Sequence, residues 1–171
     1  AEQFRRERRS ASHLLCACYI LATQCSSADA IAHVKQALQL SNMESKSDSP
    51  SEDHSLHSQY LYSILQLGSR KCADIDKELQ SIEKRTESLG LFVLHNHCLL
   101  MRGILQLIDS HQQSDLDTAK DMLKTALKGA NDLKNKKVEA PAVLYLGHYY
   151  WKCRNAVSGY EKKSDDAFSS A

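Results

Sequence analysis

Two glycines inside apolar helical stretches place the strongest constraint on how this chain folds. Gly103 lies in the apolar run that begins at Met101, and Gly147 lies in the run from Val143 to Trp151. A glycine inside a helix costs about 1 kcal/mol relative to alanine. Close approach of two helix axes explains that cost, because a small residue on one helix admits a large residue from its neighbour. The two glycines therefore predict tightly packed helical hairpins.

A triplet with one large residue between two small ones follows each glycine, and the same triplet occurs in an earlier helix. In tetratricopeptide repeats, a glycine late in the first helix and such a triplet in the second let the two helices pack. Helix, break and helix, repeated along the chain, is typical of a stacked helical-hairpin array. The triplets are Ala30/Val34/Ala37, Ala119/Leu123/Ala126 and Ser164/Phe168/Ala171.

These patterns predict an all-α protein, a tetratricopeptide-like α-solenoid of antiparallel hairpins that forms one helical-repeat domain over residues 1–171. Ile75, Leu79 and Ile82 replace the triplet in the second hairpin, which predicts less regular packing there. We expect a fragment of a longer protein, because the chain starts without Met and stops in a predicted helix. The expected hairpins cover residues 12–42, 55–89, 91–134 and 141–171, with a Ser-rich loop at 43–54.

Composition argues against several classes of function. The formal net charge of +1 gives no bulk attraction to nucleic acid, and no apolar run reaches the roughly 18–20 residues of a membrane span. The six cysteines lack paired spacing, so we expect a reduced, intracellular setting with cysteines that fill the core. Glycine-rich phosphate loops, nucleophile elbows and paired catalytic carboxylates do not occur in the sequence. We therefore expect no enzyme activity, no cofactor and no small-molecule substrate.

The histidines do not form a recognisable metal site. His95 and His97 are two positions apart and point to different sides of a helix, so they cannot chelate one ion together. His95 with Cys98, or His54 with His57, supplies only half a site. We therefore expect no bound metal.

In tetratricopeptide-like arrays the first helix of each hairpin lines the concave face, which predicts where a partner would bind. That groove would be apolar and aromatic here, and it suits an extended peptide or a helix. Core packing is the competing interpretation for each residue, and Trp151 and Tyr19 are the strongest contact candidates because they are large amphipathic anchors. The candidate groove residues are Leu15, Tyr19, Tyr60, Ile64, Leu100, Ile104, Leu144, His148 and Trp151.

Several stretches resemble a known family in their order along most of the chain. They are Leu14-Leu15 to Cys25, Ala37-Leu38-Gln39-Leu40-Ser41-Asn42, Arg102-Gly103-Ile104, Ala119-Lys120 with Leu123 and Thr125-Ala126-Leu127-Lys128, and Val143-Leu144 with Leu146-Gly147-His148, Tyr150 and Asn155. Together they resemble the C-terminal part of the Mau/cohesin-loading-factor family, the smaller, tetratricopeptide-repeat subunit of the cohesin loader. The segment Ser45–Leu89 departs from the family pattern.

The resemblance implies a non-enzymatic scaffold. In that family a tetratricopeptide superhelix encloses the extended N-terminal segment of the large, Nipped-B-like loader subunit, and the complex places cohesin on chromosomes for sister-chromatid cohesion. The implied partners are this large subunit directly and chromatin indirectly, with no membrane. The implied location is nuclear and chromatin-associated, with the cytoplasm also open. Ordering the partner segment costs entropy, which a long interface offsets.

Two other functions stay open. The first is a generic peptide-binding, tetratricopeptide-like adaptor of another cell-cycle or trafficking assembly, with transient micromolar-class affinity. The second is a nucleic-acid-binding helical repeat that uses Arg5–Arg9 and Lys134–Lys137, for which DNA binding would fall steeply with salt. Separately, Ser49-Pro50 suits a proline-directed kinase, although a plain inter-repeat insertion explains this loop as well.

Overall fold

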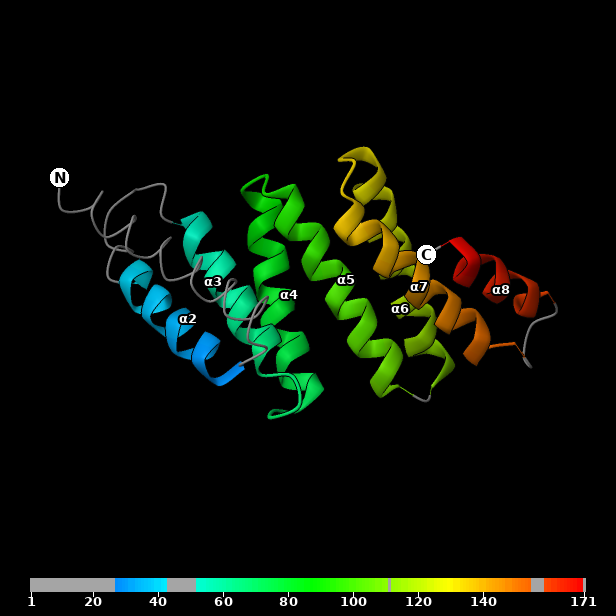
Figure 1. Ribbon diagram of the computed structural model, residues 1–171, viewed down its shortest axis with the longest axis horizontal. Coiled ribbons are helices and arrows are strands. Elements are labelled where there is room, and N and C mark those ends of the chain that lie inside the picture. The colour runs from blue at the N-terminus through cyan, green and yellow to red at the C-terminus, as the bar shows by residue number, and fades with distance from the viewer. Residues whose placement is uncertain (1–26, 43–51, 111, 155–158, 171) are drawn as a thin grey trace. The chain divides into compact units, whose positions relative to one another are not determined.

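The computed structural model describes residues 27–42, 52–110, 112–154 and 159–170, and these residues are helical with short turns (Figure 1). They contain seven α-helices and no β-strand, so the predicted all-α class is confirmed. The solenoid arrangement and the single domain stay predictions. The helices are α2 (Ser27–Asn42), α3 (Glu52–Leu65), α4 (Cys72–Ser88), α5 (Phe92–Asp109), α6 (Gln113–Asp132), α7 (Lys136–Lys152) and α8 (Tyr160–Ser170).

The chain divides into two compact units, residues 1–78 and 79–171, and the boundary falls inside α4. In the first unit α2 packs on α3. Ala30 and Val34 of α2 are fully buried, and Leu61 and Leu65 of α3 pack against them. The predicted small and large residues of α2 therefore face its neighbour.

Glu78 ties the start of α4 to α3 and to the turn between them. Its carboxylate accepts a hydrogen bond from the Ser63 hydroxyl at 2.9 Å and from the Arg70 guanidinium at 2.7 Å. Arg70 lowers the pKa of Glu78 through this hydrogen bond. The pair is partly exposed, so water screens much of its contribution to stability.

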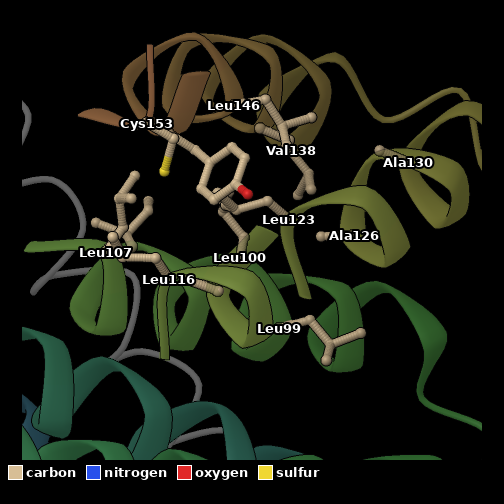
Figure 2. Packing of buried hydrophobic residues seen from close by; sticks show 14 residues of the cluster. Leu99, Leu100, Leu107, Leu116, Leu123, Ala126, Ala130, Val138, Leu146 and Cys153 are labelled. Carbon is tan, nitrogen blue, oxygen red and sulfur yellow. The ribbon is translucent and has the colours of Figure 1, made fainter. Parts of the chain in front are cut away.

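In the second unit α5, α6 and α7 pack on one another, and α8 packs on α7. Their core combines leucines with small residues from α6 (Figure 2). Ala119, Leu123, Ala126 and Ala130 are all fully buried. Figure 2 shows Leu123 in the middle of this core, among side chains of α5 and α7.

Both interior glycines lie at close helix contacts, as predicted from the sequence. A Cβ atom on Gly103 of α5 would lie 3.0 Å from Cγ of Leu123 in α6. A Cβ atom on Gly147 of α7 would lie 2.7 Å from Cε1 of Phe168 in α8. The Gly147 carbonyl oxygen also accepts a hydrogen bond from the Ser164 hydroxyl at 3.2 Å. Leu123 and Phe168, the large residues of these two triplets, therefore occupy the space that the glycines leave.

Gly90 ends α4 in a Schellman motif. Its φ of 70° is left-handed, a conformation that glycine adopts without the steric cost of a Cβ atom. The Leu91 N–H donates to the Thr86 carbonyl at 2.9 Å, and the Gly90 N–H donates to the Glu87 carbonyl at 3.2 Å. The helix thus ends within one residue of the expected hairpin limit at residue 89.

A buried ion pair joins α4 to α5 within the second unit. The Arg102 guanidinium donates to the Glu83 carboxylate, and the two side chains are 7% and 17% exposed. The His95 ring lies 3.3 Å from the Glu83 carbonyl oxygen. Removing one partner of a buried ion pair costs about 3–5 kcal/mol, because the other charge is left without compensation. This pair therefore links the second half of α4 to α5.

α7 begins at Lys136, although the sequence predicted a start at Pro141. The Asn135 side chain accepts a hydrogen bond from the Lys137 N–H at 3.2 Å and caps the helix there. Pro141 then lies inside the helix and cannot donate to the carbonyl one turn earlier. Burial of the first turn, in particular of Val138, offsets that lost hydrogen bond.

α6 begins at Gln113, and no side chain caps its first turn. Ser110 organises this turn, because its hydroxyl accepts from the Gln112 N–H at 3.2 Å and donates to the Asp115 carboxylate at 3.0 Å. α3 begins at Glu52, inside the predicted loop at 43–54.

A third glycine contact gives a test of this packing. Gly129 of α6 faces the buried Asn96 side chain of α5, and an added Cβ atom would lie 2.7 Å from Asn96 Cγ. Overpacking costs about 1–3 kcal/mol, while alanine regains about 1 kcal/mol of helix propensity. We expect Gly129→Ala to lower the free energy of unfolding by about 1 kcal/mol in urea titrations.

The matched control for Gly129→Ala removes the side chain that it meets. Asn96→Ala in the Gly129→Ala background relieves the overlap, so the double variant should be more stable than the sum of the two single changes predicts. Strictly additive effects would show that Gly129 and Asn96 do not constrain each other.

Candidate protein-binding face

α7 has a different environment on each of its sides. Val138, Ala142, Leu146 and Tyr149 are buried in the core shared with α5 and α6. Gly147 meets α8. Two sides of the helix are therefore covered by other helices. The remaining side is exposed.

This remaining side, which we call the open face, consists of Leu144, His148 and Trp151 on α7 with Arg154 just beyond its end. Spacings of four and three residues place the three α7 side chains on one side of the helix. Leu144 is 39% exposed and Trp151 is 51% exposed. Phe168 of α8 borders the face, and its ring lies 5.3 Å from the His148 ring in an edge-on arrangement. The structure thus brings together three of the candidate groove residues.

Arg154 adds a positive charge to the open face. Its guanidinium lies 4.3 Å from the centre of the Trp151 ring, and its Nη1 donates to the Trp151 carbonyl at 2.8 Å. A cation–π contact at an exposed site contributes about 0.5–1 kcal/mol. Arg154 is not among the residues expected to bind a partner, although its position three residues after Trp151 is a signal for contact between the two side chains.

A hydrogen bond from Tyr149 holds α7 on α6. The Tyr149 hydroxyl donates to the Asp117 carboxylate at 2.6 Å. Lys120 donates to the same carboxylate oxygen at 3.0 Å and lies 5.3 Å from the centre of the Tyr149 ring. Burial raises the pKa of Tyr149, and the Tyr149 hydrogen bond, followed by that of Lys120, lowers the pKa of Asp117. In the same last turn of α7, Lys152 donates to the Leu107 carbonyl of α5 at 2.5 Å.

Aromatic and cation–π contacts hold α8 on α7. The rings of Tyr150 and Tyr160 lie 5.1 Å apart, and the Lys163 ammonium is 5.7 Å and 5.1 Å from their centres. Burial raises the pKa of Tyr150. These contacts and the Gly147–Phe168 contact set where Phe168 borders the open face.

The other candidate groove residues do not join the open face. Leu100 and Ile104 are 4% and 8% exposed, and their side of α5 belongs to the core shared with α6 and α7. The prediction that these two residues line a binding groove is therefore wrong. Tyr60 and Ile64 of α3 are half-buried in the first unit. Leu15 and Tyr19 lie outside the described residues.

Two of the described cysteines fill the core, as predicted. Cys98 and Cys153 are buried, whereas Cys72 is half-buried. Burial raises the pKa of the Cys98 thiol to about 12. Cys98 therefore stays a thiol at neutral pH and is a poor nucleophile.

Two of the described histidines contact a carboxylate or carbonyl oxygen of a nearby residue. His57 lies 2.8 Å from the Asp53 carboxylate, and His95 contacts the main chain of Glu83. Within the described residues, no three His, Cys, Asp or Glu side chains gather in a group that could hold a metal ion. The His54 side chain is not among those described.

The basic segment at the start of α7 bears on the nucleic-acid-binding alternative. Lys136 pairs with Glu139 at 2.6 Å, so part of the charge of Lys134–Lys137 is compensated locally. Arg5–Arg9 and Ser49 lie outside the described residues.

In the described part of the chain, no helix has both the length and the hydropathy of a membrane span.

Comparisons with known proteins do not assign the chain to a family. No protein-family model matches it, and no curated protein matches it.

The Asp117–Tyr149 pair predicts how stability changes in acid. The lowered pKa of Asp117 means that the pair stabilises the fold above the ordinary carboxyl pKa of about 4, and that this contribution is lost as the pH falls through the folded-state pKa. We expect wild type to lose more stability than Tyr149→Phe between about pH 5 and about pH 2 in urea titrations. Asp121→Asn, on the exposed side of α6, should keep the wild-type dependence. Equal losses in wild type and Tyr149→Phe would contradict this role of the hydroxyl.

Proposed function

We propose that the protein is a non-enzymatic scaffold that binds an extended segment of a protein partner along the open face of α7. The observation that carries this proposal is the exposure of Trp151 and Leu144 on one side of a helix whose opposite side is buried. Large aromatic side chains that are half-exposed and held on a packed element are typical anchors of protein interfaces. The rigid core behind α7 supports binding, because little of the face must be ordered on contact.

A more specific proposal names the protein assembly in which this scaffold acts. The resemblance to the Mau/cohesin-loading-factor family makes the extended N-terminal segment of the large, Nipped-B-like loader subunit the partner to test first. In this proposal the helices form a tetratricopeptide-like α-solenoid, and the protein acts in the nucleus in cohesin loading and sister-chromatid cohesion. Contact with chromatin is then indirect, through the partner.

The alternative is a peptide-binding adaptor of another cell-cycle or trafficking assembly. The binding face would be the same, but the partner would differ. The two proposals are separated by the identity of the segment that binds purified protein through Trp151.

The proposal is tested with purified protein and a fluorescently labelled N-terminal segment of the large loader subunit. We expect binding by fluorescence anisotropy, and we expect Leu144→Ala/Trp151→Ala to weaken it at least about tenfold, because truncating an interface anchor commonly costs more than 1.4 kcal/mol. The matched control is Phe92→Ala/Val93→Ala, which removes exposed apolar side chains at the start of α5 and should leave the affinity unchanged.

Each result has a defined meaning. Equal weakening by both double variants would show general loss of apolar surface and count against the open face. Absence of binding by the loader segment would reject the named partner. Direct binding of a purified segment from another assembly, lost in Leu144→Ala/Trp151→Ala alone, would favour the adaptor.

A further inference from the structure

α8 contributes less to the core than the other helices of the second unit. Ser164 is the one buried residue of α8, whereas α5, α6 and α7 each bury several apolar side chains. Tyr160, Ala167 and Phe168 of α8 all stay at least partly exposed. With 11 residues, α8 is also shorter than the roughly 12–15 residues at which an isolated helix becomes even marginally stable in water. Its helical structure therefore depends on its contact with α7.

The buried core of the second unit does not include α8. In this unit α8 packs on α7 (Figure 1), and Tyr160 touches the core shared by α5, α6 and α7 from outside. The ring of Tyr160 lies 6.0 Å from the ring of Tyr149 and 5.1 Å from that of Tyr150. Detachment of α8 therefore uncovers the outer side of these two tyrosines but leaves the packing of α5, α6 and α7 on one another in place.

The contact of α8 with α7 depends on one register of the two helices. Ser164 and Phe168 lie one turn apart on the same side of α8. The Ser164 hydroxyl donates to the Gly147 carbonyl, and the Phe168 ring occupies the space beside Gly147. A helix shifted along α7 by one residue would lose both contacts together. α8 is therefore either docked in this register or detached.

Detachment of α8 leaves no buried polar group of this contact without a partner. The Gly147 carbonyl also accepts a main-chain hydrogen bond within α7, so it stays paired when Ser164 leaves. The Ser164 hydroxyl then reaches water. Lys163, whose ammonium lies near the Tyr160 ring, is already exposed in the docked state. Opening of α8 thus costs less free energy than unfolding of the core.

Gly159 supplies a hinge directly before α8. Its φ of 84° is left-handed, and an added Cβ atom would meet no other described atom within 4 Å. Glycine adopts left-handed conformations without the steric cost of a Cβ atom. In hinge motions a few residues at the ends of elements absorb the change in backbone angles. α8 can therefore move about Gly159 as one piece.

We infer that α8 is a hinged strap that detaches from α7 as one unit while α5, α6 and α7 stay folded. Detachment exposes the side of α7 that carries Gly147 and Tyr150, and it separates the Phe168 ring from His148 of the open face. This conformational change goes beyond the proposed function and does not depend on which partner binds.

Native-state hydrogen exchange of the whole chain, followed by mass spectrometry of peptic fragments, measures the opening of each helix. We expect the amides of α8 to exchange at least about tenfold faster than those of α6 and α7, with a weaker dependence on urea below the unfolding transition, because opening of α8 exposes little surface. Equal exchange rates with equal urea dependence would show that α8 opens only on global unfolding, which overturns the inference.

Gly147→Ala tests the contact without weakening α7. The added Cβ atom would lie 2.7 Å from Phe168 Cε1, while alanine favours the helical state of α7. We expect the amides of α8 to exchange about tenfold faster in this variant, because overpacking opposes docking. The amides of α6 should exchange at the wild-type rate. An increase of the same size in α5, α6 and α8 would make α8 part of one cooperative unit with the core and would overturn the inference.

Ser164→Ala tests the hydroxyl alone, and Ser169→Ala, at an exposed serine of the same helix, is the matched control. Ser164→Ala should speed the exchange of α8 about threefold, because the lost hydrogen bond outweighs the higher helix propensity of alanine. Ser169→Ala should not speed it. Equal effects of the two serine changes would contradict docking through Gly147 and would overturn the inference.

Discussion

Small residues on α6 determine how the second unit is built. Ala119, Ala126 and Ala130 are fully buried and add little bulk, so α5 and α7 pack on α6 and also on each other. Leu123 fills the space beside Gly103 and supplies a large apolar side chain at the centre. The core is thus shared by three helices, and α8 covers a second side of α7 at Gly147. The remaining side of α7 stays exposed at Leu144 and Trp151.

Much of the helical structure could be predicted because its signals are local. The contacts of Gly103 and Gly147 follow from the cost of glycine in a helix, and the stop at Gly90 follows from its left-handed backbone. The start of α7 could not be read locally. Pro141 suggested a first turn, but the Asn135 cap and the burial of Val138 extend the helix past it.

Sequence periodicity identified apolar stripes but not what covers each stripe. Leu100 and Ile104 show the same four-residue spacing as Leu144 and His148, yet the first pair is buried and the second is exposed. The difference depends on which side of each helix has a neighbour, and a single helix does not encode that information. Arg154 was missed for a related reason, since a charged residue beyond a helix end is ordinarily solvated.

The buried polar residues could not be predicted either, because their partners lie on other helices. Arg102 is a lone charge within an apolar run, and the sequence does not show that Glu83 of α4 is its partner. Asn96 similarly lies against the one glycine of α6 that admits it. Such contacts add little net stability over apolar packing, but a shifted helix register would leave a buried charge or amide without its partner.

The attachment of α8 has a consequence for how rigid the open face is. α8 is short and is held on α7 by Phe168 over Gly147, the Ser164 hydroxyl and the contacts of Tyr160 and Lys163. Its detachment would leave the core of α5, α6 and α7 intact, so α8 can open locally at a lower free energy than global unfolding requires. Trp151 and Leu144 then form a fixed edge of the face, while Phe168 forms an adjustable one. A surface with one fixed and one adjustable edge can accept segments of different width without repacking its core.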